Sequence, residues 1–450
     1  MNLIDKYNVP VPRYTSYPTV PSWKNNITEE QWSQHVKQAF EVSNDKDGIS
    51  IYIHLPFCES LCTYCACNTR ITVNHKVEEP YIDALLKEWE HYLRIFGARP
   101  RIKELHLGGG TPTFFKAENL ERLLTAILQS SIVCSNADFS FEAHPANTTV
   151  EHLKTLYDLG FRRVSFGIQD FDLTVQEAIN RYQTYDEVDY IVKSARLVGY
   201  TSINFDVVYG LPFQNQEGLK NTIRKIITIR PERIAFYSYA HVPWVKPGQR
   251  KFTEQDLPVG ETKRQLYEAG QNLFLENGYC EIGMDHFALK SDVLFKAAES
   301  KGLHRNFMGY TPYYTRLLIG LGVSSISDTG DAFAQNLKTV EEYYDCINKD
   351  ALPVFKGHVL SPEDLFLRRV ILNIMCHFET SWNEHAKMHK VFSDGLKRLE
   401  KLEEDGLVEI YPYFLEVTEK GKPFLRNICL CFDEHYWSSI KSKETYSTSV

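Results

Sequence analysis

Short runs of β-branched and aromatic residues alternate with longer stretches between about residues 49 and 240. Each run has the length and composition of a β-strand and is bounded by turn or charged residues. The runs are ISIYIH at 49–54, IKELHL at 102–107, DFSFE at 138–142, RRVSFG at 162–167, SINFDVVY at 202–209 and RIAFYSY at 233–239. The pattern therefore predicts six strands in this part of the chain.

The stretches between the strands have a helical period. Apolar residues recur every three or four positions along 81–93, 120–127 and 153–159. Gly160 follows the last of these stretches, where a glycine commonly ends a helix. Strand-then-helix units at this spacing predict parallel strands joined by right-handed crossovers.

Polar residues follow the ends of the predicted strands, and their placement favours a barrel over a doubly wound sheet. Cysteines follow the first strand, glycines 108–110 follow the second, and acidic or amide side chains follow the next three. A βα-barrel builds its active site from loops at the carboxyl ends of its strands. We predict an α/β fold with an incomplete parallel (β/α)6 barrel, open on one side and roomy enough for a large substrate.

Three regions are predicted from the change of pattern along the chain. Residues 1–48 carry several prolines and tyrosines and predict an N-terminal arm packed on the barrel. Residues 49–355 hold the barrel and its extension. From Ser361 the pattern becomes two helices, a charged turn, a hairpin and another helix. Residues 356–450 therefore predict a small, mainly helical, winged-helix-like C-terminal domain.

The charge balance and the distribution of apolar residues narrow the class of protein. Fifty Lys and Arg against 58 Asp and Glu give a net charge of −8, whereas general nucleic-acid binding relies on basic surface. No apolar run approaches the ~20 residues of a membrane span. The first residues lack the basic and then apolar pattern of a secretory signal. We expect a cytoplasmic protein with no nucleic-acid or membrane partner.

The strongest chemical signal is the segment CESLCTYCAC, which holds four of the ten cysteines. Cys58, Cys62 and Cys65 form a C-x3-C-x2-C spacing on a loop directly after a strand. Three thiolates can hold three irons of a 4Fe–4S cluster and leave the fourth iron open for chemistry. The alternatives are a structural zinc site with Cys67 as fourth ligand, or buried free cysteines. Zinc sites usually show two separated C-x-x-C pairs, which favours the cluster here.

At this motif the sequence resembles the radical S-adenosylmethionine enzymes. Over longer segments it is similar to the oxygen-independent coproporphyrinogen III oxidases (coproporphyrinogen dehydrogenases) of that superfamily. The similar segments run in family order from Lys6 to Phe432: KYNVPVPRYTSYPT, YIHLPFCESLCTYCAC, HLGGGTPT, GIQDF, NFDVVYGLP, YSYAHVP, GMDHFA, HRNF, GYT, GVSSIS and RNICLCF.

The resemblance implies oxidative decarboxylation of two propionates of coproporphyrinogen III to vinyl groups, giving protoporphyrinogen IX in anaerobic haem biosynthesis. It implies one 4Fe–4S cluster and two molecules of S-adenosylmethionine as cofactors. An electron from the cluster would cleave S-adenosylmethionine to a 5′-deoxyadenosyl radical, which abstracts a hydrogen from a propionate. A one-electron donor of the flavodoxin or ferredoxin type is implied as partner, and we expect a monomer.

The resemblance also implies roles for single residues. Cys58, Cys62 and Cys65 are the implied cluster ligands, and Cys67 matches a cysteine that is required without binding the cluster. Positions around the first S-adenosylmethionine are matched by Tyr52, Tyr64, Gly109, Glu142 and Ile326. Positions around the second are matched by Gly110, Thr111, Gln169, Arg181, Asp206 and Ala240.

Several of these residues have ordinary structural explanations when taken alone. Tyr52 and Tyr64 fit core aromatics as well as ligand contacts, Glu142 fits a solvated acid at a strand end, and Ile326 fits a core residue. Tyr52 and His54 lie two residues apart on a strand and share a face. We predict that both take part in catalysis.

The implied substrate carries four carboxylates although the chain is net negative, so its pocket must be locally basic. Arg13 in PRYTSYP is the first candidate for binding a propionate, and we predict a catalytic role for it. The further candidates are Lys246, Arg250 and Arg305. Each of these cations also fits an ordinary surface residue.

Departures from the family pattern leave some contacts open. His144 stands in EAHP where an acid or amide is common, beside Glu142, and Met308 stands in NFMGY where glutamine is common. GYTPYYT also differs after its first three residues.

Three other functions are compatible with a cysteine motif of this kind. They are a related haem-binding chaperone, a zinc-stabilised binding module, and a radical enzyme that acts on another tetrapyrrole. The PRYTSYP arm and Cys67 favour the dehydrogenase over the chaperone.

Overall fold

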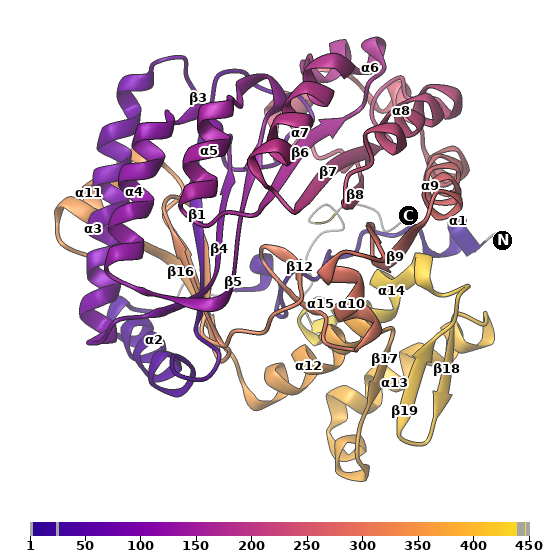
Figure 1. Ribbon diagram of the computed structural model, residues 1–450. Helices are drawn as coiled ribbons and strands as arrows, with labels where there is room; N and C mark the ends of the chain where they lie inside the picture. The colour runs from indigo at the N-terminus through magenta and orange to yellow at the C-terminus, as the bar shows by residue number, and fades with distance from the viewer. Residues whose placement is uncertain (1–2, 24–26, 439–445, 447–450) are drawn as a thin grey trace.

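A computed structural model describes residues 3–23, 27–438 and 446 of the chain (Figure 1). All six predicted strands are present, and each pairs in parallel with the next along the chain. They are β1 (Ile49–Leu55), β4 (Arg101–Gly109), β5 (Ile132–Ala143), β6 (Arg163–Gln169), β7 (Ser202–Tyr209) and β8 (Arg233–Ser238). The parallel strand-and-helix core is thereby confirmed.

The sheet extends beyond these six strands at both edges, to twelve strands in the part of the chain that the structure describes. β13 (Leu317–Leu321) pairs in parallel with β1 and sets Gly320 beside Tyr52. Antiparallel strands continue both edges: β14 (Ile326–Asp328), β15 (Ala332–Asn336) and β16 (Val354–Val359) beyond β13, and β10 (His286–Leu289) and β9 (Tyr279–Gly283) beyond β8. The barrel is thus a curved open sheet with a seventh parallel strand.

The helices cover the outer face of this sheet (Figure 1). Strand residues that point outward, such as Ile51, Leu105 and Phe141, are fully buried in one core with the apolar stripes of the helices. The covering helices are α3 (Glu78–Phe96), α4 (Ala117–Gln129), α5 (Val150–Asp158), α7 (Tyr185–Val198) and α8 (Gln216–Ile229). The predicted helical period at 81–93, 120–127 and 153–159 is confirmed.

The N-terminal arm packs in two places. Its helix α2 (Glu29–Ser43) joins the barrel core, where the Trp32 indole donates to the Tyr92 hydroxyl at 3.2 Å. The segment before it shares a second core with the C-terminal region, to which Tyr14 and Tyr17 contribute. The arm therefore bridges two parts of the molecule, and its predicted boundary at residue 48 stays a prediction.

The C-terminal region has the predicted order of two helices, a hairpin and a helix, and lies below the barrel in Figure 1. A short strand after the first helix adds a third member to the hairpin sheet. The elements are α12 (Pro362–His377), β17 (Glu379–Ser381), α13 (Lys390–Glu404), β18 (Val408–Tyr411), β19 (Phe414–Val417), α14 (Leu425–Leu430) and α15 (Glu434–Ser438). Its boundary at residue 356 also stays a prediction.

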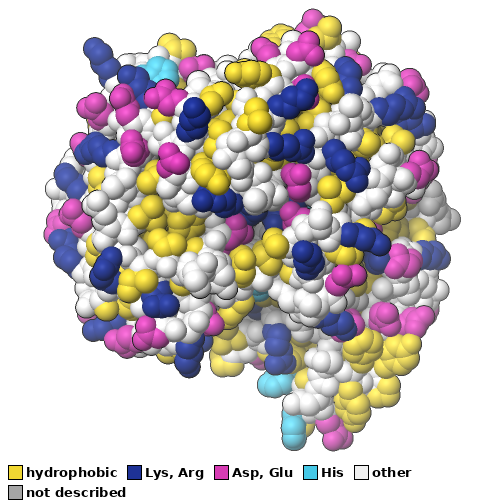
Figure 2. Space-filling view, in the orientation of Figure 1, with side chains coloured by type: hydrophobic (Ala, Val, Ile, Leu, Met, Phe, Trp, Pro, Cys, Tyr) yellow, Lys and Arg dark blue, Asp and Glu magenta, His cyan; other side chains and the backbone are white. Residues whose placement is uncertain are grey.

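Basic and acidic side chains are interspersed on the face shown in Figure 2. Among the described residues, no helix is both long enough and apolar enough to cross a membrane.

Candidate functional site

A cavity of about 800 Å³ opens at the carboxyl ends of the parallel strands. It brings together most of the residues predicted for the site, although they come from segments far apart in the sequence. Those that line it are Arg13, Cys58, Cys62, Tyr64, Cys65, Cys67, Gly109, Gly110, Thr111, Glu142, Gln169, Arg181, Asp206 and Ala240. The topology explains this gathering, because parallel strands end at the same edge of a sheet.

Cys58 ends the short strand β2 (Phe57–Cys58), Cys62 and Cys65 follow it, and each has a polar neighbour. Thr111 Oγ1 lies 3.4 Å from the sulfur of Cys58, and the Arg181 guanidinium donates to the sulfur of Cys62 at 3.6 Å. Burial raises the pKa of Cys58 to about 11. A hydrogen bond from the Cys67 thiol lowers the pKa of Cys65, which favours its thiolate.

The spacing of these thiols suits a cluster better than a single ion. Thiolates around one tetrahedral zinc ion stand about 4 Å apart, given Zn–S bonds of about 2.3 Å. The sulfur atoms of Cys58, Cys62, Cys65 and Cys67 include no set of three that all lie within 4.8 Å of one another. In this structure the thiols are therefore not gathered closely enough for a single zinc ion, and the cluster remains the interpretation of the motif.

A neighbouring loop holds the cysteine loop from the side. Lys246 Nζ donates to the carbonyl oxygen of Cys67 at 3.0 Å, and the Gln249 amide donates to that of Tyr64 at 3.0 Å. Lys246 is thus a support of the loop, whereas the predicted alternative Arg250 is exposed and lies outside the cavity lining.

The glycine turn after β4 allows two backbone segments to approach closely. Gly109 has a φ of 110°, and a Cβ there would lie 2.5 Å from the His54 imidazole. A Cβ on Gly110 would lie 2.6 Å from the carbonyl group of Pro56. Only glycine satisfies both the left-handed backbone and the contact with His54.

Tyr52 and His54 lie beneath the cavity rather than among the residues that line it. The Tyr52 hydroxyl is 3.0 Å from His54 Nδ1, and His54 Nε2 is 2.8 Å from the carbonyl oxygen of Asn68. Burial lowers the pKa of His54 and favours its neutral form. The contacts suit positioning of the glycine turn, and the predicted catalytic role of the pair stays a prediction.

Glu142, at the end of β5, faces the cavity with 44% of its side chain exposed. Its Oε2 accepts from the Gly109 N–H at 3.1 Å, and its Oε1 lies 3.6 Å from His106 Nε2. Burial would raise the pKa of Glu142, but His106 and the Gly109 N–H hold it below its ordinary value. An ionised carboxylate is thus available to a ligand amino group or hydroxyl.

His106 is a residue of the site that the sequence analysis missed. Its Nδ1 lies 2.8 Å from Ser140 Oγ, and its ring stacks on Tyr52 with centroids 6.0 Å apart. The strand alternation in IKELHLGG places His106 on the same face as Gly108, and this period was the available signal.

A second group of polar residues lines the cavity at β6 to β8. The Arg181 guanidinium donates to the Gly167 carbonyl at 2.6 Å, and a Cβ on Gly167 would meet both Gln169 and Arg181 within 2.8 Å. Asp206 accepts from Ser165 Oγ and from the Asn204 amide, both at 2.9 Å. Burial and the charge of Glu142 raise the pKa of Asp206 to about 6.

Both residues that depart from the family pattern line the cavity. His144 Nδ1 accepts from the Ala146 N–H at 3.1 Å, while burial and Arg181 lower the pKa of His144 to about 3. His144 is therefore neutral at pH 7, and Glu142 has no contact with it among the described hydrogen bonds. Met308 presents a thioether to the same cavity.

The remaining predicted residues lie around the site. Arg13 lines the cavity and donates to the Ser238 carbonyl at 2.6 Å. Arg305 is buried over the ring of Tyr310, 4.4 Å from its centroid, and does not line the cavity. Ile326 lies outside the lining, with its backbone against Gly320, the β13 partner of Tyr52.

Comparisons with known proteins agree with this geometry. Residues 52–226 match the model of the radical SAM superfamily. The chain is 37% identical to the oxygen-independent coproporphyrinogen III oxidase of Synechocystis over 98% of its length and 96% of the relative's. For the Escherichia coli enzyme of the same name these values are 36%, 96% and 94%.

A solved structure extends the similarity to three dimensions. Coproporphyrinogen III oxidase from Escherichia coli, described as a radical SAM enzyme, superimposes with a TM-score of 0.89 at 34% identity. The match covers 94% of this chain and 97% of that one. The chain therefore belongs to the family of oxygen-independent coproporphyrinogen III oxidases, which are radical SAM enzymes.

Proposed function

We propose that this protein oxidatively decarboxylates two propionate side chains of coproporphyrinogen III to vinyl groups, giving protoporphyrinogen IX in haem biosynthesis. The observation that carries the proposal is the convergence of three thiols, a glycine turn and an ionised Glu142 in one cavity, in a member of this family. The cavity of about 800 Å³ has room for a large ligand beside a cofactor.

The residues of the cysteine loop fit a 4Fe–4S cluster, with Cys58, Cys62 and Cys65 as its ligands. When bound, the cluster and S-adenosylmethionine supply the radical that removes a substrate hydrogen atom. Arg181 beside Cys62 offsets part of the negative charge of the thiolates.

Two S-adenosylmethionine molecules are proposed because the ligand residues form two groups. Gly109 and Glu142 form one group at β4 and β5, where the carboxylate can accept from an amino group or ribose hydroxyl. Gln169, Arg181 and Asp206 form the other at β6 and β7. A single molecule that engages the first group would leave the second without a ligand.

Arg13 is proposed to bind a propionate of the substrate. Its guanidinium reaches the cavity, and none of the ion pairs found among the described residues includes it. A cation that faces a cavity without a carboxylate partner is suited to an anionic ligand.

The electron donor is proposed to be an acidic flavodoxin or ferredoxin type of protein that docks beside the cysteine loop. Exposed Arg250 and Lys251 give the surface beside the cysteine loop a positive charge, and Leu61 adds exposed apolar area to it. We expect the double variant R250E/K251E to slow reduction by the donor about 10-fold, with reduction by dithionite unchanged. Equal rates with the protein donor would contradict this docking site.

We further propose a monomer that acts in the cytoplasm.

The function is tested by anaerobic turnover. The protein is reconstituted with iron and sulfide and supplied with reductant, S-adenosylmethionine and coproporphyrinogen III. Oxidised porphyrin products are then analysed by mass. Loss of two CO₂ per substrate, with matching 5′-deoxyadenosine, is the expected result, and the C62S variant serves as the cluster-deficient control.

Two outcomes would contradict the proposal at different levels. If S-adenosylmethionine is cleaved while coproporphyrinogen III stays intact, the substrate is another tetrapyrrole. Stoichiometric haem binding without decarboxylation would instead indicate a chaperone.

A further inference from the structure

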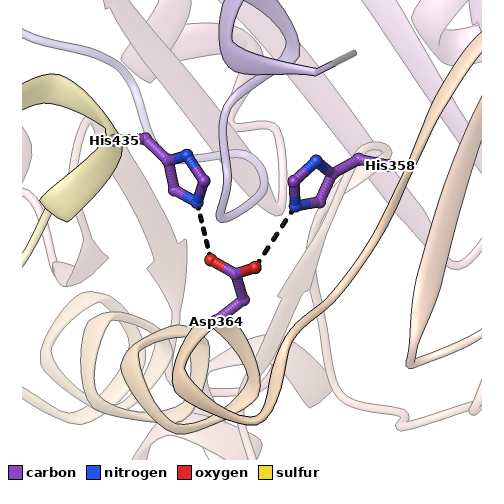
Figure 3. Close-up of side chains that lie close together, drawn as sticks. All are labelled: His358, Asp364 and His435. Atoms are coloured by element: carbon purple, nitrogen blue, oxygen red, sulfur yellow. Dashed lines mark hydrogen bonds and ion pairs between the residues drawn. The ribbon is translucent and has the colours of Figure 1, made fainter. Parts of the chain in front are cut away.

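Two imidazoles and one carboxylate converge where β16, α12 and α15 meet, outside the cavity lining (Figure 3). His435 Nε2 lies 2.6 Å from Asp364 Oδ1, and His358 Nε2 lies 3.3 Å from Asp364 Oδ2. One ligand atom from each residue lies within 4.8 Å of the others. Three separate segments thus direct metal-ligating atoms at one point.

The carboxylate of Asp364 is held in place by the start of α12. Its Oδ2 accepts from the backbone N–H of Ser361 at 3.0 Å and from the Ser361 hydroxyl at 2.9 Å, which completes a capping box. Because the cap uses Oδ2, Oδ1 is left to face His435. Burial would raise the pKa of Asp364, but hydrogen bonds from His358, His435 and Ser361 hold it well below its usual range.

The surroundings of the cluster are formed by the N-terminal arm as well. The ring of Tyr17 packs edge-on against His435 with centroids 5.9 Å apart, and the Tyr17 hydroxyl accepts from the Glu434 N–H at 3.2 Å. The side chains of His358 and Asp364 are 9% exposed, and that of His435 is 28% exposed. The cluster is therefore mostly enclosed, and His435 is its most exposed member.

We infer that His358, Asp364 and His435 form a binding site for a divalent transition metal ion of the zinc type. Imidazole and carboxylate are ligands that zinc accepts at about 2.0–2.2 Å. Ligand atoms at these distances from a tetrahedral ion stand about 3.4 Å apart, so His435 Nε2 would move back from Asp364 by several tenths of an ångström to admit the ion. Each imidazole then binds through an unprotonated Nε2 and keeps its proton on Nδ1, and any further proton is released to solvent.

The ion would strengthen the contact between parts of the molecule and would take no part in the chemistry of the cavity. His358 belongs to the edge of the main sheet, Asp364 begins the C-terminal region, and His435 lies near the end of the chain beside the arm. A bound metal would link these segments and stabilise their contact by mass action.

The test is a cobalt titration of the cluster-loaded protein under anaerobic conditions, in which Cys58, Cys62 and Cys65 are occupied by iron. One equivalent of Co²⁺ should bind with the d–d absorption of an imidazole and carboxylate site, and Zn²⁺ should displace it. We expect H358Q and H435Q each to weaken binding at least 30-fold. His385→Gln, an exposed histidine of η7 (Glu384–Met388), is the matched control and should bind like the wild type.

Thermal unfolding with and without Zn²⁺ gives a second measurement. The melting temperature of the wild type should rise with Zn²⁺, and that of H435Q should not. If H358Q does not fold, H435Q alone still tests the inference. The inference is overturned by Co²⁺ binding that persists in both variants, by a thiolate-to-cobalt charge-transfer band, or by no binding at all. Turnover of coproporphyrinogen III is not part of the readout, so this result and that of the proposed function are independent.

Discussion

The inner face of the parallel sheet carries polar side chains at both ends of its strands, but the two ends use them differently. At the carboxyl ends, the cavity is lined by Glu142 and by Arg181, which follows α6 (Leu173–Ile179). At the amino ends, Arg163 pairs with Asp138 at 2.7 Å. Residues from both ends of the strands line the cavity, so a place in the lining does not by itself distinguish a ligand-binding residue from a structural one.

The group that we call the floor comprises Arg163 and Arg233, which begin β6 and β8, with Asp138 inside β5 and Asp292 at the start of α10 (Val293–Glu299). Arg233 and Asp292 pair at 2.8 Å with at most 6% of either side chain exposed. Each charge in the floor is thus neutralised by another protein side chain. At the carboxyl ends of the strands, which we call the rim, charged side chains face the cavity and remain available to a ligand. The comparison teaches that a polar residue in a barrel is functional or structural according to which end of its strand it occupies.

The largest expected effect is the loss of a cluster ligand at the rim. Cys65→Ala should abolish turnover, by at least 1000-fold, because two thiolates cannot hold the cluster. The free energy of unfolding of the cluster-free protein should change by less than about 1 kcal/mol, since the loop makes few core contacts. Iron content and denaturant unfolding measure the two effects. The control is Cys134→Ala, a cysteine near the amino end of β5. A cluster retained by Cys65→Ala would refute the assignment of Cys65 as a cluster ligand.

The floor should show the opposite behaviour. Arg163→Met leaves the buried carboxylate of Asp138 without its partner and should reduce the free energy of unfolding by about 3 kcal/mol. Adding Asp138→Asn should restore part of this loss. The matched control is Arg224→Met, which removes an exposed arginine of α8. A change below about 0.5 kcal/mol in urea denaturation would mean that the floor is not structural.

Arg13 provides an intermediate test at the rim. Arg13→Met should raise the KM for coproporphyrinogen III about 10- to 30-fold, because one charge-assisted contact to a propionate is lost. The value of kcat should stay within about threefold, and Arg224→Met should leave both constants unchanged. An unaltered KM would remove Arg13 from the substrate site.

The smallest expected effect concerns Asp206. Its pKa of about 6 lies above the ordinary value of 3.8, so the folded protein holds this proton more tightly than the unfolded chain does. Wild-type stability should therefore fall as pH rises from about 4 to 6, relative to Asp206→Asn. A shift of this size corresponds to at most about 3 kcal/mol, and because Asp206 is only partly buried, we expect the ligand-free variant to be the more stable by about 1 kcal/mol at pH 7.5. Parallel pH curves for the two proteins would show that burial does not perturb this carboxyl group.

Much of the rim could be predicted from the sequence because it depends on local patterns. Short runs of β-branched and aromatic residues located the six strands, and the end of each strand located residues such as Glu142 and Asp206. The cysteine spacing predicted the cluster site, and the family resemblance named most of the remaining residues that line the cavity.

The floor and the seventh strand could not be found in this way. The pairing of Arg163 with Asp138 depends on the register between two strands, which no single segment encodes. β13 is a fully buried run, so it shows no alternation, and its parallel partner β1 lies more than 250 residues earlier in the sequence. Arg305 shows the same limit, since a charged residue gave no sign that it would be buried.

The shared core of the arm and the C-terminal region has a consequence for biosynthesis. Tyr14 and Tyr17 share this core with Ile428 and its neighbours, which are synthesised more than 400 residues later. At roughly 5–20 residues per second, the arm is made about 20 s or more before its partners exist. The barrel can form during this interval, whereas the second core closes only after Ile428 and its neighbours have been synthesised.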